Sequence, residues 1–511
     1  MMGSERTLGR LAEQSWDRLG DFDALYYEGF WHRGLHLAER TRHVTGGLKG
    51  FGVEPGDRVV VMLVNCPEAQ IAYQALWAAG AVVTPVVFLV AAEELRHIVI
   101  DSEPRALIVS AELMPTVLAA TEGLDIPVIV VGEVRAADAE GAGPRISGFA
   151  DLEEAAEAGA VSRDEDDLAA LMYTGGTTGR AKGVMLSHAG LWHVSRAAHD
   201  LTYQPEVNRA IVPVPLTHSY GLIISITGMH ALEPLHTVLM RWFTPKAFLQ
   251  LATEHRTQYG AVVPTMLREL LAEPLETTPL PDLLYLTCGA APLAREVLVE
   301  FERRMSGVRI VEGYGLTETS AVTTVNPLDR RKVGSAGLPL PGYTLTIRDD
   351  DGEPVEPGDI GEICVRGESI MRGYWRSPNT SDHAVVNGEL RTGDIGCMDD
   401  DGYLYVVDRK KDLIIRGGFN VFPRDVEDAL NKHPDVALSA VVGRQDPRLG
   451  EEVVAFVQLE PGGTVSAERL IEWARERLGR VRYPREVRFV ESIPVTSVMK
   501  IDRKVLRSEL T

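Results

Sequence analysis

Runs typical of buried strands alternate with helical stretches through most of the first 330 residues, and this alternation constrains the fold most. "RVVVMLVN" (58–65) precedes "PEAQIAYQALWAAG" (67–80), and "RALIVS" (105–110) precedes "AELMPTVLAA" (111–120). Such alternation predicts doubly wound parallel sheets with helices on both faces. The pattern returns in the second half of this region, from "YGAVVP" (259–264) onward, so we expect two sheets of this kind.

The segment 75–92, "ALWAAGAVVTPVVFLVAA", is long and apolar enough to mimic a membrane span. Gly80 and Pro85 interrupt it, and two glutamates follow it instead of cations. We interpret it as a buried helix ending near Gly80, followed by a buried strand that enters Pro85. The chain opens without a secretory signal, and its four cysteines have neither metal nor disulfide spacing. We therefore expect a cytoplasmic protein without a membrane span.

After about residue 330 the pattern changes to short β runs separated by Gly, Pro and Asp turns. "GYTLTIRDDDGEPVEPGDIGEICVRG" (342–367) is typical of a small antiparallel sheet or barrel. The rest of the chain has the pattern of a compact α+β tail. Since 511 residues are too many for one core, several structural units are expected.

A loop rich in glycine and threonine, "YTGGTTGRAKG" (173–183), connects two strand-like runs. Amides freed by glycines can converge on phosphate oxygens, and the hydroxyls and the lysine add donors and charge. It lacks the G-K-[ST] ending of a P-loop, because Arg180 and Ala181 separate Gly179 from Lys182. A plain surface hairpin is the alternative. The formal charge of −21 argues against a nucleic-acid surface, so an anionic ligand must be bound locally.

Four further motifs follow in order, and each is weak alone: "VEGYGLTET" (311–319), "LRTGDIG" (390–396), "VVDRKKDLI" (406–414) and "IPVTSVMKIDRKVLR" (493–507). In order and spacing the whole set resembles the adenylate-forming (ANL) superfamily of acyl-CoA synthetases, luciferases and peptide-synthetase adenylation domains. The resemblance extends from about residue 40 to residue 507. "GGFNVFPRDVE" (417–427) is more similar to the acyl-CoA synthetase, or acid–CoA ligase, branch.

The resemblance implies an α/β fold in two domains. The N-terminal AMP-binding domain (1–408) would contain two doubly wound sheets and a small β-barrel. The C-terminal α+β domain (409–511) would be mobile about a hinge near Lys411. Members convert a carboxylic acid and MgATP into an acyl-adenylate and pyrophosphate, then pass the acyl group to a thiol, usually that of CoA. ATP, Mg²⁺ and CoA are thus the implied cofactors.

Residues at matching positions acquire expected roles from the same resemblance. Tyr314 would stack on adenine, and Asp394 would accept hydrogen bonds from the ribose hydroxyls with support from Arg409. Glu318 would bind Mg²⁺, a hard ion that prefers carboxylate oxygen, and Thr317 would act near the α-phosphate. A helix-start acid is the alternative for Glu318, and a plain turn residue for Asp394. The other positions expected to contact ATP or AMP are Thr174, Gly175, Gly176, Thr177, Thr178, Gly179, Lys182, Gly289, Ala290, Ala291, Glu312 and Gly313.

Lys500 matches the C-terminal lysine that bridges the carboxylate and the α-phosphate during adenylation. One flexible cation there would offset the repulsion between two anionic reactants. Met499 stands where glycine usually precedes this lysine. The alternative for Lys500 is that it is just one of several cations in the tail. Rotation at Lys411 would withdraw Lys500 and present Gly417 and Gly418 beside the CoA pantetheine channel. A plain turn is the alternative for the two glycines.

The acid substrate is expected beside "VPLTHSYGLIISITG" (214–228). His218 matches an aromatic gate residue near the reacting carboxylate and is counted with Lys500 and Thr317 as catalytic. Tyr220 and Ile224 would line the acyl pocket, although a packed core tyrosine is the alternative for Tyr220. The apolar composition of this wall favours a hydrophobic, fairly bulky acid.

An AMP-forming acid–CoA ligase is the leading hypothesis. The main alternative is an enzyme that stops at the acyl-adenylate or loads a carrier protein. A nucleotide-binding protein without turnover is the alternative from a different class, motivated by Met499, and a luciferase-type oxygenase is more remote. The expected partners are a small carboxylic acid, ATP and CoA, with no nucleic acid; a carrier protein and a homodimer are left open.

Overall fold

The computed structural model describes residues 5–133, 145–174, 180–278, 280–496 and 501–510. The chain divides into two compact units. Unit 1 comprises residues 1–344 and 365–390, and unit 2 comprises residues 345–364 and 391–511. The expected domain boundary at 408/409 and the hinge near Lys411 stay predictions.

The first large sheet of unit 1 has seven strands in the order β7-β6-β5-β3-β4-β8-β9. All neighbours are parallel except the edge pair β8 and β9. Valine, isoleucine and leucine dominate the central strands, as burial on both faces requires. The strands are β3 (Arg58–Met62), β4 (Val82–Pro85), β5 (Ala106–Ser110), β6 (Val128–Val131), β7 (Ile146–Gly148), β8 (Leu168–Thr174) and β9 (Lys182–Ser187).

The second large sheet of unit 1 has nine strands in the order β16-β15-β14-β13-β12-β10-β11-β1-β2. Its centre, from β14 to β1, is parallel, and both edges are antiparallel. The strands are β1 (Asp23–Tyr27), β2 (Phe30–Arg33), β10 (Arg209–Val212), β11 (His236–Leu239), β12 (Tyr259–Val262), β13 (Tyr285–Cys288), β14 (Arg309–Tyr314), β15 (Thr324–Val325) and β16 (Leu338–Pro339).

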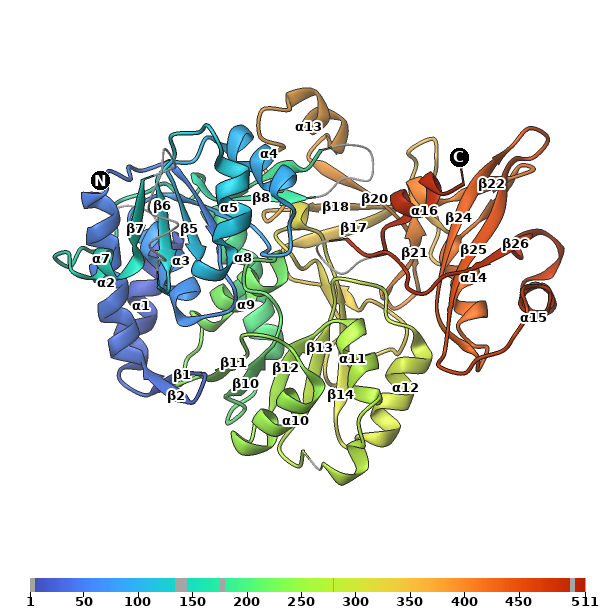
Figure 1. The fold of residues 1–511 in the computed structure, drawn as a ribbon, viewed down its shortest axis with the longest axis horizontal. Helices are drawn as coiled ribbons and strands as arrows, with labels where there is room; N and C mark the ends of the chain where they lie inside the picture. The colour runs from blue at the N-terminus through green and yellow to red at the C-terminus, as the bar shows by residue number, and fades with distance from the viewer. Residues whose placement is uncertain (1–4, 134–144, 175–179, 279, 497–500, 511) are drawn as a thin grey trace. The chain divides into compact units, whose positions relative to one another are not determined.

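Helices and 3₁₀ turns connect the strands of these two sheets, and Figure 1 shows α10, α11 and α12 beside β12 to β14. Among the described residues, the helical elements of unit 1 are α1 (Leu8–Leu19), α2 (Gly34–Gly50), α3 (Pro67–Ala78), α4 (Ala92–Ser102), η1 (Ala111–Leu113), α5 (Met114–Thr121), α7 (Phe149–Glu153), α8 (His188–Thr202), α9 (Ser219–Gly228), α10 (Pro245–Glu254), α11 (Pro264–Leu271), η2 (Leu275–Thr277), α12 (Arg295–Arg304), η3 (Thr317–Thr319) and α13 (Pro378–Ala384). Two doubly wound sheets were expected, and this fold class is confirmed.

The region predicted to form a small antiparallel sheet or barrel is a five-stranded sheet in the order β17-β18-β20-β19, with β21 paired to β20. Its strands are β17 (Tyr343–Arg348), β18 (Gly361–Gly367), β19 (Val385–Val386), β20 (Glu389–Met398) and β21 (Leu404–Arg409). β20 pairs antiparallel with both β19 and β21. Gly, Pro and Asp turns separate these short strands, as the sequence predicts.

The α+β tail of unit 2 is built on another five-stranded sheet, in the order β23-β22-β25-β24 with β26 paired to β25. Its strands are β22 (Ile414–Arg416), β23 (Phe419–Val421), β24 (Val436–Asp446), β25 (Gly450–Leu459) and β26 (Glu486–Phe489). The helical elements are η4 (Lys410–Asp412), α14 (Pro423–Leu430), α15 (Ala467–Arg482) and α16 (Arg503–Ser508).

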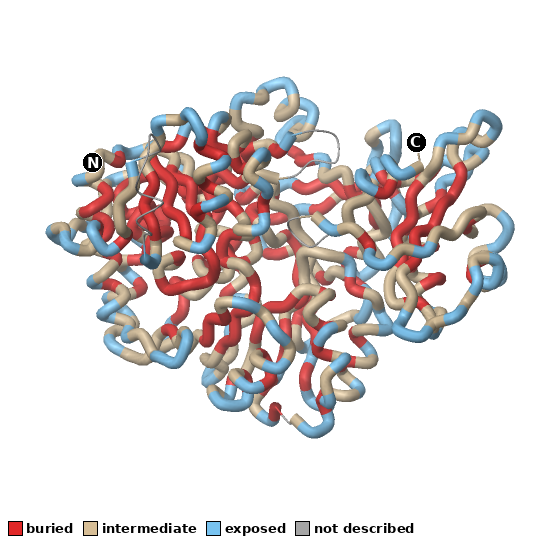
Figure 2. Tube along the Cα trace, viewed as in Figure 1, coloured by how far each residue is buried: buried red, intermediate tan, exposed pale blue. Residues whose placement is uncertain are grey.

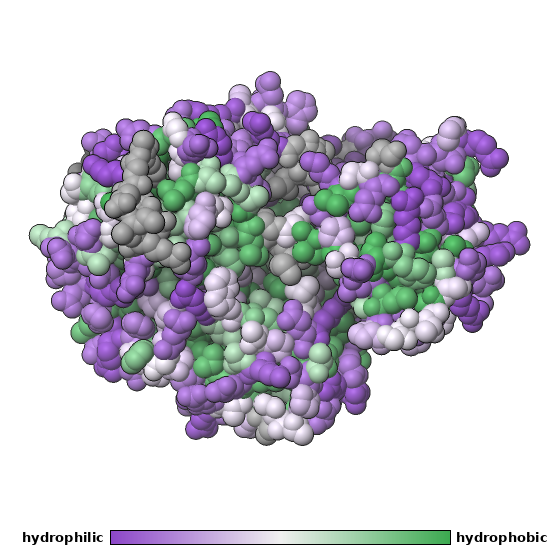
Figure 3. Space-filling model, viewed as in Figure 1, coloured by the Kyte–Doolittle hydropathy of each residue, from purple (hydrophilic) through white to green (hydrophobic). Residues whose placement is uncertain are grey.

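Apolar side chains of the strands form the cores of both units, and Figure 2 shows buried stretches along the strands of the large sheets. Hydrophilic side chains predominate at the periphery of the face drawn in Figure 3. The membrane-like segment is split as predicted, because α3 ends at Ala78 and the buried β4 begins at Val82. Among the described residues, no helix combines the length and apolar character needed to cross a bilayer.

Candidate active site

The glycine- and threonine-rich loop joins β8 to β9 as a hairpin. The two strands are antiparallel, and Thr174 at the end of β8 lies opposite Lys182 at the start of β9. Both residues are half-buried. Gly175, Gly176, Thr177, Thr178 and Gly179 lie outside the described residues, so their contacts with phosphate stay predictions. The strand-to-strand connection itself is as the sequence predicts.

Predicted nucleotide residues lie where β13 and β14 end. Gly289 directly follows β13, while Glu312, Gly313 and Tyr314 form the end of β14. A Cβ placed on Gly289 would lie 3.4 Å from the carbonyl oxygen of Gly313, so the two glycines are close neighbours. Glu312 Oε2 accepts a hydrogen bond from the amide of Gly334 at 3.3 Å. The carboxyl ends of parallel strands are where open α/β sheets bind ligands.

Three non-glycine residues beside these strand ends have left-handed backbone conformations. The φ angles are 69° at Ala290, 55° at Ser320 and 86° at Ala321. Such conformations cost roughly 1–3 kcal/mol each and persist where the surroundings enforce them, often at functional sites. Ala290 and its neighbour Ala291 are half-buried beside the end of β13.

Thr317 and Glu318 begin η3, which follows β14 after two residues. The hydroxyl of Tyr374 donates a hydrogen bond to Glu318 Oε1 at 2.9 Å. The same tyrosine ring faces the ammonium of Lys182, whose Nζ lies 5.4 Å from the ring centroid. Tyr374 thereby brings together a predicted phosphate-binding lysine and the predicted metal carboxylate. All three residues belong to unit 1.

Tyr374 was not among the predicted site residues. Its only signal in the sequence is an aromatic residue after a glycine in "MRGYW" (371–375), which is typical of many turns. Burial raises the pKa of its phenol, and the charge of Glu318 and the hydrogen bond to that carboxylate raise this pKa further. The hydroxyl therefore stays protonated and remains a hydrogen-bond donor at neutral pH.

The chemistry and the exposure of the Glu318 carboxylate are suitable for a ligand of Mg²⁺. Glu318 is half-buried, and among the described residues only the Tyr374 hydroxyl donates a hydrogen bond to its carboxylate. Oε2 is thus not committed to a described donor. Mg²⁺ usually binds through one or two carboxylates together with substrate phosphates and water, so a single glutamate beside a phosphate loop is a suitable donor set.

The predicted acid-binding residues lie on α9 and at its start. His218 is the N-cap of this helix, and its Nδ1 accepts a hydrogen bond from the amide of Tyr220 at 3.2 Å. The Tyr220 hydroxyl lies 2.7 Å from Oγ1 of Thr287 on β13. Burial raises the pKa of Tyr220, while the hydrogen bond with Thr287 lowers it. Ile224, one turn along α9, is half-buried.

This arrangement joins α9 to the strand that ends beside Gly289. The hydrogen bond to Thr287 uses the hydroxyl of Tyr220, so the ring of this residue is fixed between the helix and β13. A tyrosine held in this way is compatible with the core role that we considered and with a wall of an acyl pocket. The acid-binding role of His218, Tyr220 and Ile224 stays a prediction.

In unit 2, the predicted ribose residues face each other across two strands. Asp394 on β20 lies opposite Arg409, the last residue of β21. The arginine Nε is 3.3 Å from Asp394 Oδ1, and the Asp394 side chain is buried whereas that of Arg409 is partly exposed. The pairing places a guanidinium beside the carboxylate.

The remaining predicted residues of unit 2 belong to its tail. Lys411 is exposed in η4, between β21 and β22. Gly417 and Gly418 form the two-residue turn between β22 and β23, with φ angles of 58° and 82°. A type I′ hairpin turn requires positive φ at both positions. The turn therefore explains why both residues are glycine without any role in CoA binding. Lys500 and Met499 lie outside the described residues.

Comparisons with known proteins identify the family of the chain. Residues 12–375 match the AMP-binding enzyme family, and residues 425–500 match the AMP-binding enzyme C-terminal domain. A feruloyl-CoA synthase of Amycolatopsis sp is 36% identical over 477 residues, which are 91% of this chain and 91% of that protein. A long-chain-fatty-acid–CoA ligase of Bacillus subtilis is 33% identical over 488 residues, covering 90% of this chain and 87% of the relative.

A similar solved structure is that of the amide bond synthetase McbA from Marinactinospora thermotolerans. It has a TM-score of 0.87 and 29% sequence identity, and the match covers 99% of this chain and 100% of the other. The family matches, the related sequences and the shared fold lead to one conclusion. This chain belongs to the AMP-binding enzyme family.

Proposed function

We propose that this protein is an AMP-forming acid–CoA ligase. In the first half-reaction a carboxylate oxygen of the acid attacks the α-phosphorus of ATP, and pyrophosphate leaves. In the second, the thiolate sulfur of CoA attacks the acyl carbonyl carbon, and AMP leaves. Relatives named as a feruloyl-CoA synthase and a long-chain-fatty-acid–CoA ligase support this assignment over about nine-tenths of the chain.

One observation carries the proposal: Tyr374 contacts both Glu318 and Lys182. The contact brings the end of a glycine-rich hairpin and an available carboxylate to one place. Lys182 and Glu318, held on different parts of the Tyr374 side chain, suit a metal-bound polyphosphate. The lysine can bind phosphate oxygens while the carboxylate binds the metal. Bound Mg²⁺ would neutralise charge on the ATP phosphates.

Each predicted residue has a role in this reaction. Lys182 binds the phosphates, Asp394 and Arg409 hold the ribose, and Tyr314 stacks on adenine. Lys500 offsets the repulsion between the carboxylate of the acid and the α-phosphate, with Thr317 nearby. After adenylation, rotation at Lys411 brings Gly417 and Gly418 beside CoA.

The acid is hydrophobic and fairly bulky. Tyr220 and Ile224 on α9 present an aromatic ring and an aliphatic chain, and their helix carries no acidic or basic side chain. Such a wall favours an aromatic or aliphatic acid over one with a second charge. The related proteins act, by name, on a feruloyl group and on long-chain fatty acids, so both kinds of acid belong in the test.

The test combines ATP–pyrophosphate exchange with mass detection of acyl-CoA. Wild-type protein is incubated with MgATP, CoA and one acid at a time: ferulic, benzoic, octanoic or palmitic acid. We expect acid-dependent exchange and acyl-CoA formation with at least one hydrophobic acid. Lys500→Ala should lose the exchange, whereas Lys504→Ala, an exposed lysine of the same tail, should retain it. Absence of exchange with every acid would contradict the proposal.

A second candidate is an enzyme that passes the acyl-adenylate to an acceptor other than CoA. The structural similarity to an amide bond synthetase over nearly the whole chain supports it. An amine would then attack the carbonyl carbon, and AMP would leave. Exchange without acyl-CoA, together with amide formation when an amine is added, would favour this candidate. A carrier protein as acceptor, a homodimer and a cytoplasmic location stay predictions.

A further inference from the structure

The segment that carries Tyr374 lies against the phosphate hairpin. Its backbone pairs with β9 through three hydrogen bonds: Met185 N to Gly373 O (3.0 Å), Arg372 N to Met185 O (2.8 Å) and Trp375 N to Gly183 O (2.7 Å). Tyr374 itself lies opposite Val184 in an antiparallel bridge. Residues 372–375 thus add to the edge of the seven-stranded sheet beside β9. The β9 residues with which they pair, Gly183 to Met185, directly follow Lys182 in the sequence.

The same segment is also attached to η3, the element that carries Glu318. Met371 N donates to the Glu318 carbonyl oxygen at 2.8 Å, and the Ser320 hydroxyl donates to the Ser369 carbonyl oxygen at 2.7 Å. The Tyr374 amide is held in turn by Oγ of Ser381 in α13, at 2.8 Å. Tyr374 therefore projects from a backbone that is fixed on both sides.

The tyrosine side chain separates two opposite charges while contacting both. Its face receives Lys182 and its hydroxyl donates to Glu318, and among the described residues no ion pair joins this lysine to this glutamate. A direct pair would neutralise each group before a ligand arrives. Through a neutral ring, the ammonium stays available for phosphate and one carboxylate oxygen stays available for a metal.

The geometry points to Tyr374 as a positioning residue that orients the Glu318 carboxylate toward Mg²⁺ and seats the Lys182 ammonium beside the ATP phosphates. This inference rests on the proposed function. Hydrogen bonds from outer groups fix the rotamer of a ligating side chain, and their removal commonly lowers metal affinity about 10–100-fold. The hydroxyl serves the carboxylate and the ring serves the lysine, so two substitutions separate the two roles.

The experiment measures binding instead of turnover. Mn²⁺ replaces Mg²⁺, and its dissociation constant is measured by electron paramagnetic resonance in the presence of α,β-methylene-ATP. Affinity for the analogue alone is measured by calorimetry without metal. Tyr374→Phe keeps the ring and removes the hydroxyl, so we expect Mn²⁺ binding to weaken about 10-fold with little change for the metal-free analogue. Tyr374→Leu also removes the ring and should weaken both.

Tyr343→Phe is the matched control. Its hydroxyl donates to the Thr319 carbonyl oxygen at 2.5 Å, one residue from Glu318, without contacting the carboxylate. This variant removes a buried hydrogen bond between a tyrosine hydroxyl and η3, the element that carries Glu318. It should bind Mn²⁺ as wild type does. Equal Mn²⁺ affinity in wild type and Tyr374→Phe would overturn the inference, and so would equal weakening in Tyr343→Phe.

The two proposals fail in distinguishable ways. If wild-type protein binds Mn²⁺ with the analogue but Tyr374→Phe binds it equally well, only the role of Tyr374 falls. If wild type binds Mn²⁺ and the variant loses it while no acid supports pyrophosphate exchange, the role of Tyr374 stands and the proposed reaction falls. If wild type binds no Mn²⁺ with the analogue, both fall.

Discussion

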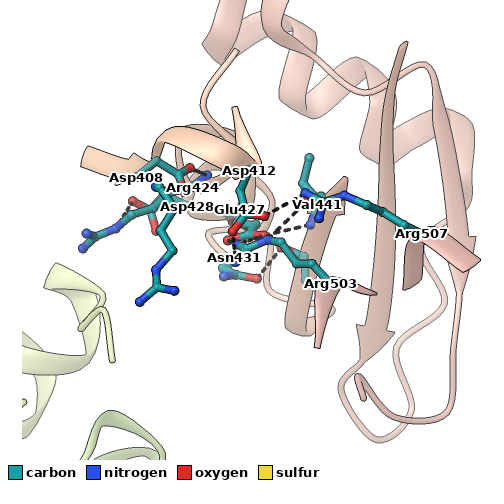
Figure 4. A network of polar contacts seen from close by, with 11 residues as sticks. Asp408, Asp412, Arg424, Glu427, Asp428, Asn431, Val441, Arg503 and Arg507 are labelled. Carbon is teal, nitrogen blue, oxygen red and sulfur yellow. Dashed lines mark hydrogen bonds and ion pairs between the residues drawn. The ribbon is translucent and has the colours of Figure 1, made fainter. Parts of the chain in front are cut away.

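Arg503 donates two hydrogen bonds to the carboxylate of Glu427, with Nη2 2.7 Å from Oε1 and 2.9 Å from Oε2. The pair joins α16 to α14 within unit 2, and both side chains are largely buried. Glu427 also accepts from the amide of Val441 on β24 at 2.8 Å. Figure 4 shows these residues close together beside the tail sheet, and Val441 lies midway along β24. A buried charge with this many partners is satisfied only while all of them stay in place.

The same network reaches the segment of the predicted hinge. Asp412, which directly follows Lys411, accepts a hydrogen bond from Arg507 at 2.7 Å and lies 3.9 Å from Arg503. Asp408 accepts from the amides of Arg409 and Arg424. Arg507 of α16 is thus bonded to Asp412, and this helix begins three residues after Lys500. The network ties the residues on both sides of this segment to the tail core.

Removal of Arg503 should strongly destabilise unit 2. In Arg503→Met the carboxylate of Glu427 loses its cation while remaining buried, and an uncompensated buried charge costs about 3–5 kcal/mol. Urea unfolding followed by circular dichroism would measure the change.

Arg482→Met is the matched control, because Arg482 pairs with Asp425 of the same helix α14 but both side chains are well exposed. That change should cost less than about 1 kcal/mol. Equal losses in the two variants would contradict the prediction.

His188 should make the stability of unit 1 depend on pH. Burial lowers the pKa of this histidine from 6.5 to about 3, with a smaller contribution from Arg163. Its Nδ1 accepts from the amide of Leu8 at 3.2 Å, and Nε2 has no hydrogen-bond partner among the described residues. Between these two pKa values the unfolded chain binds a proton that the folded chain does not, so stability falls as pH falls.

The expected loss begins below about pH 6.5 and approaches 1.4 kcal/mol per pH unit until the folded pKa is reached. His188→Asn serves as the control, because the amide oxygen can accept from Leu8 in place of Nδ1 but does not titrate. The difference in urea midpoint between wild type and this variant should change steadily from pH 7 to pH 4. A constant difference would show that His188 does not cause the dependence.

Gly221 should be intolerant of a side chain because α9 packs closely on its own connecting loop. A Cβ at this position would lie 2.1 Å from the carbonyl oxygen of Pro215 and 2.6 Å from Cα of Leu216. Gly221→Ala must displace backbone, so we expect a loss of about 1–3 kcal/mol and weaker binding of the acid, since Tyr220 and Ile224 shift with the helix. Thermal unfolding and the KM for the acid would measure both effects.

Gly228, at the other end of α9, provides the comparison. A Cβ there would lie 3.6 Å from the Leu235 side chain, which is an ordinary contact. Gly228→Ala should be neutral or slightly stabilising, because alanine favours helix over glycine by roughly 1 kcal/mol. A similar loss in both variants would mean that the close packing at Gly221 is not the cause.

Much of the fold follows from local sequence patterns, but the pairing across the site does not. The runs of valine and isoleucine identify β3, β5 and β6 because burial on both faces demands such residues, and the break at Gly80 separates α3 from β4. The contact of Tyr374 with Lys182 and Glu318 joins residues far apart in sequence. The periodicity of the sequence does not predict this contact, because the contact depends on the backbone pairing of residues 372–375 with β9.

The pair Gly417 and Gly418 illustrates the opposite case. The resemblance assigns both to a CoA channel, and a turn between two short strands was the alternative. Their positive φ angles in the two-residue turn explain the glycines by backbone conformation alone. Residue type therefore does not distinguish a CoA contact from a turn here, and that role stays a prediction.

Asp394→Asn should weaken nucleotide binding more than it weakens the fold. In the proposed role the carboxylate would accept from the ribose hydroxyls as a charged partner beside Arg409 Nε at 3.3 Å, whereas an amide would accept more weakly. Hydrogen bonds to a charged group contribute about 1.5–3 kcal/mol, so the dissociation constant for ATP should rise roughly 10–150-fold. Calorimetric titration with α,β-methylene-ATP would measure this dissociation constant.

Asp400→Asn makes the same chemical change at an exposed position in the turn between β20 and β21, and it should bind the analogue as wild type does. Unchanged affinity in Asp394→Asn would remove this residue from the nucleotide site.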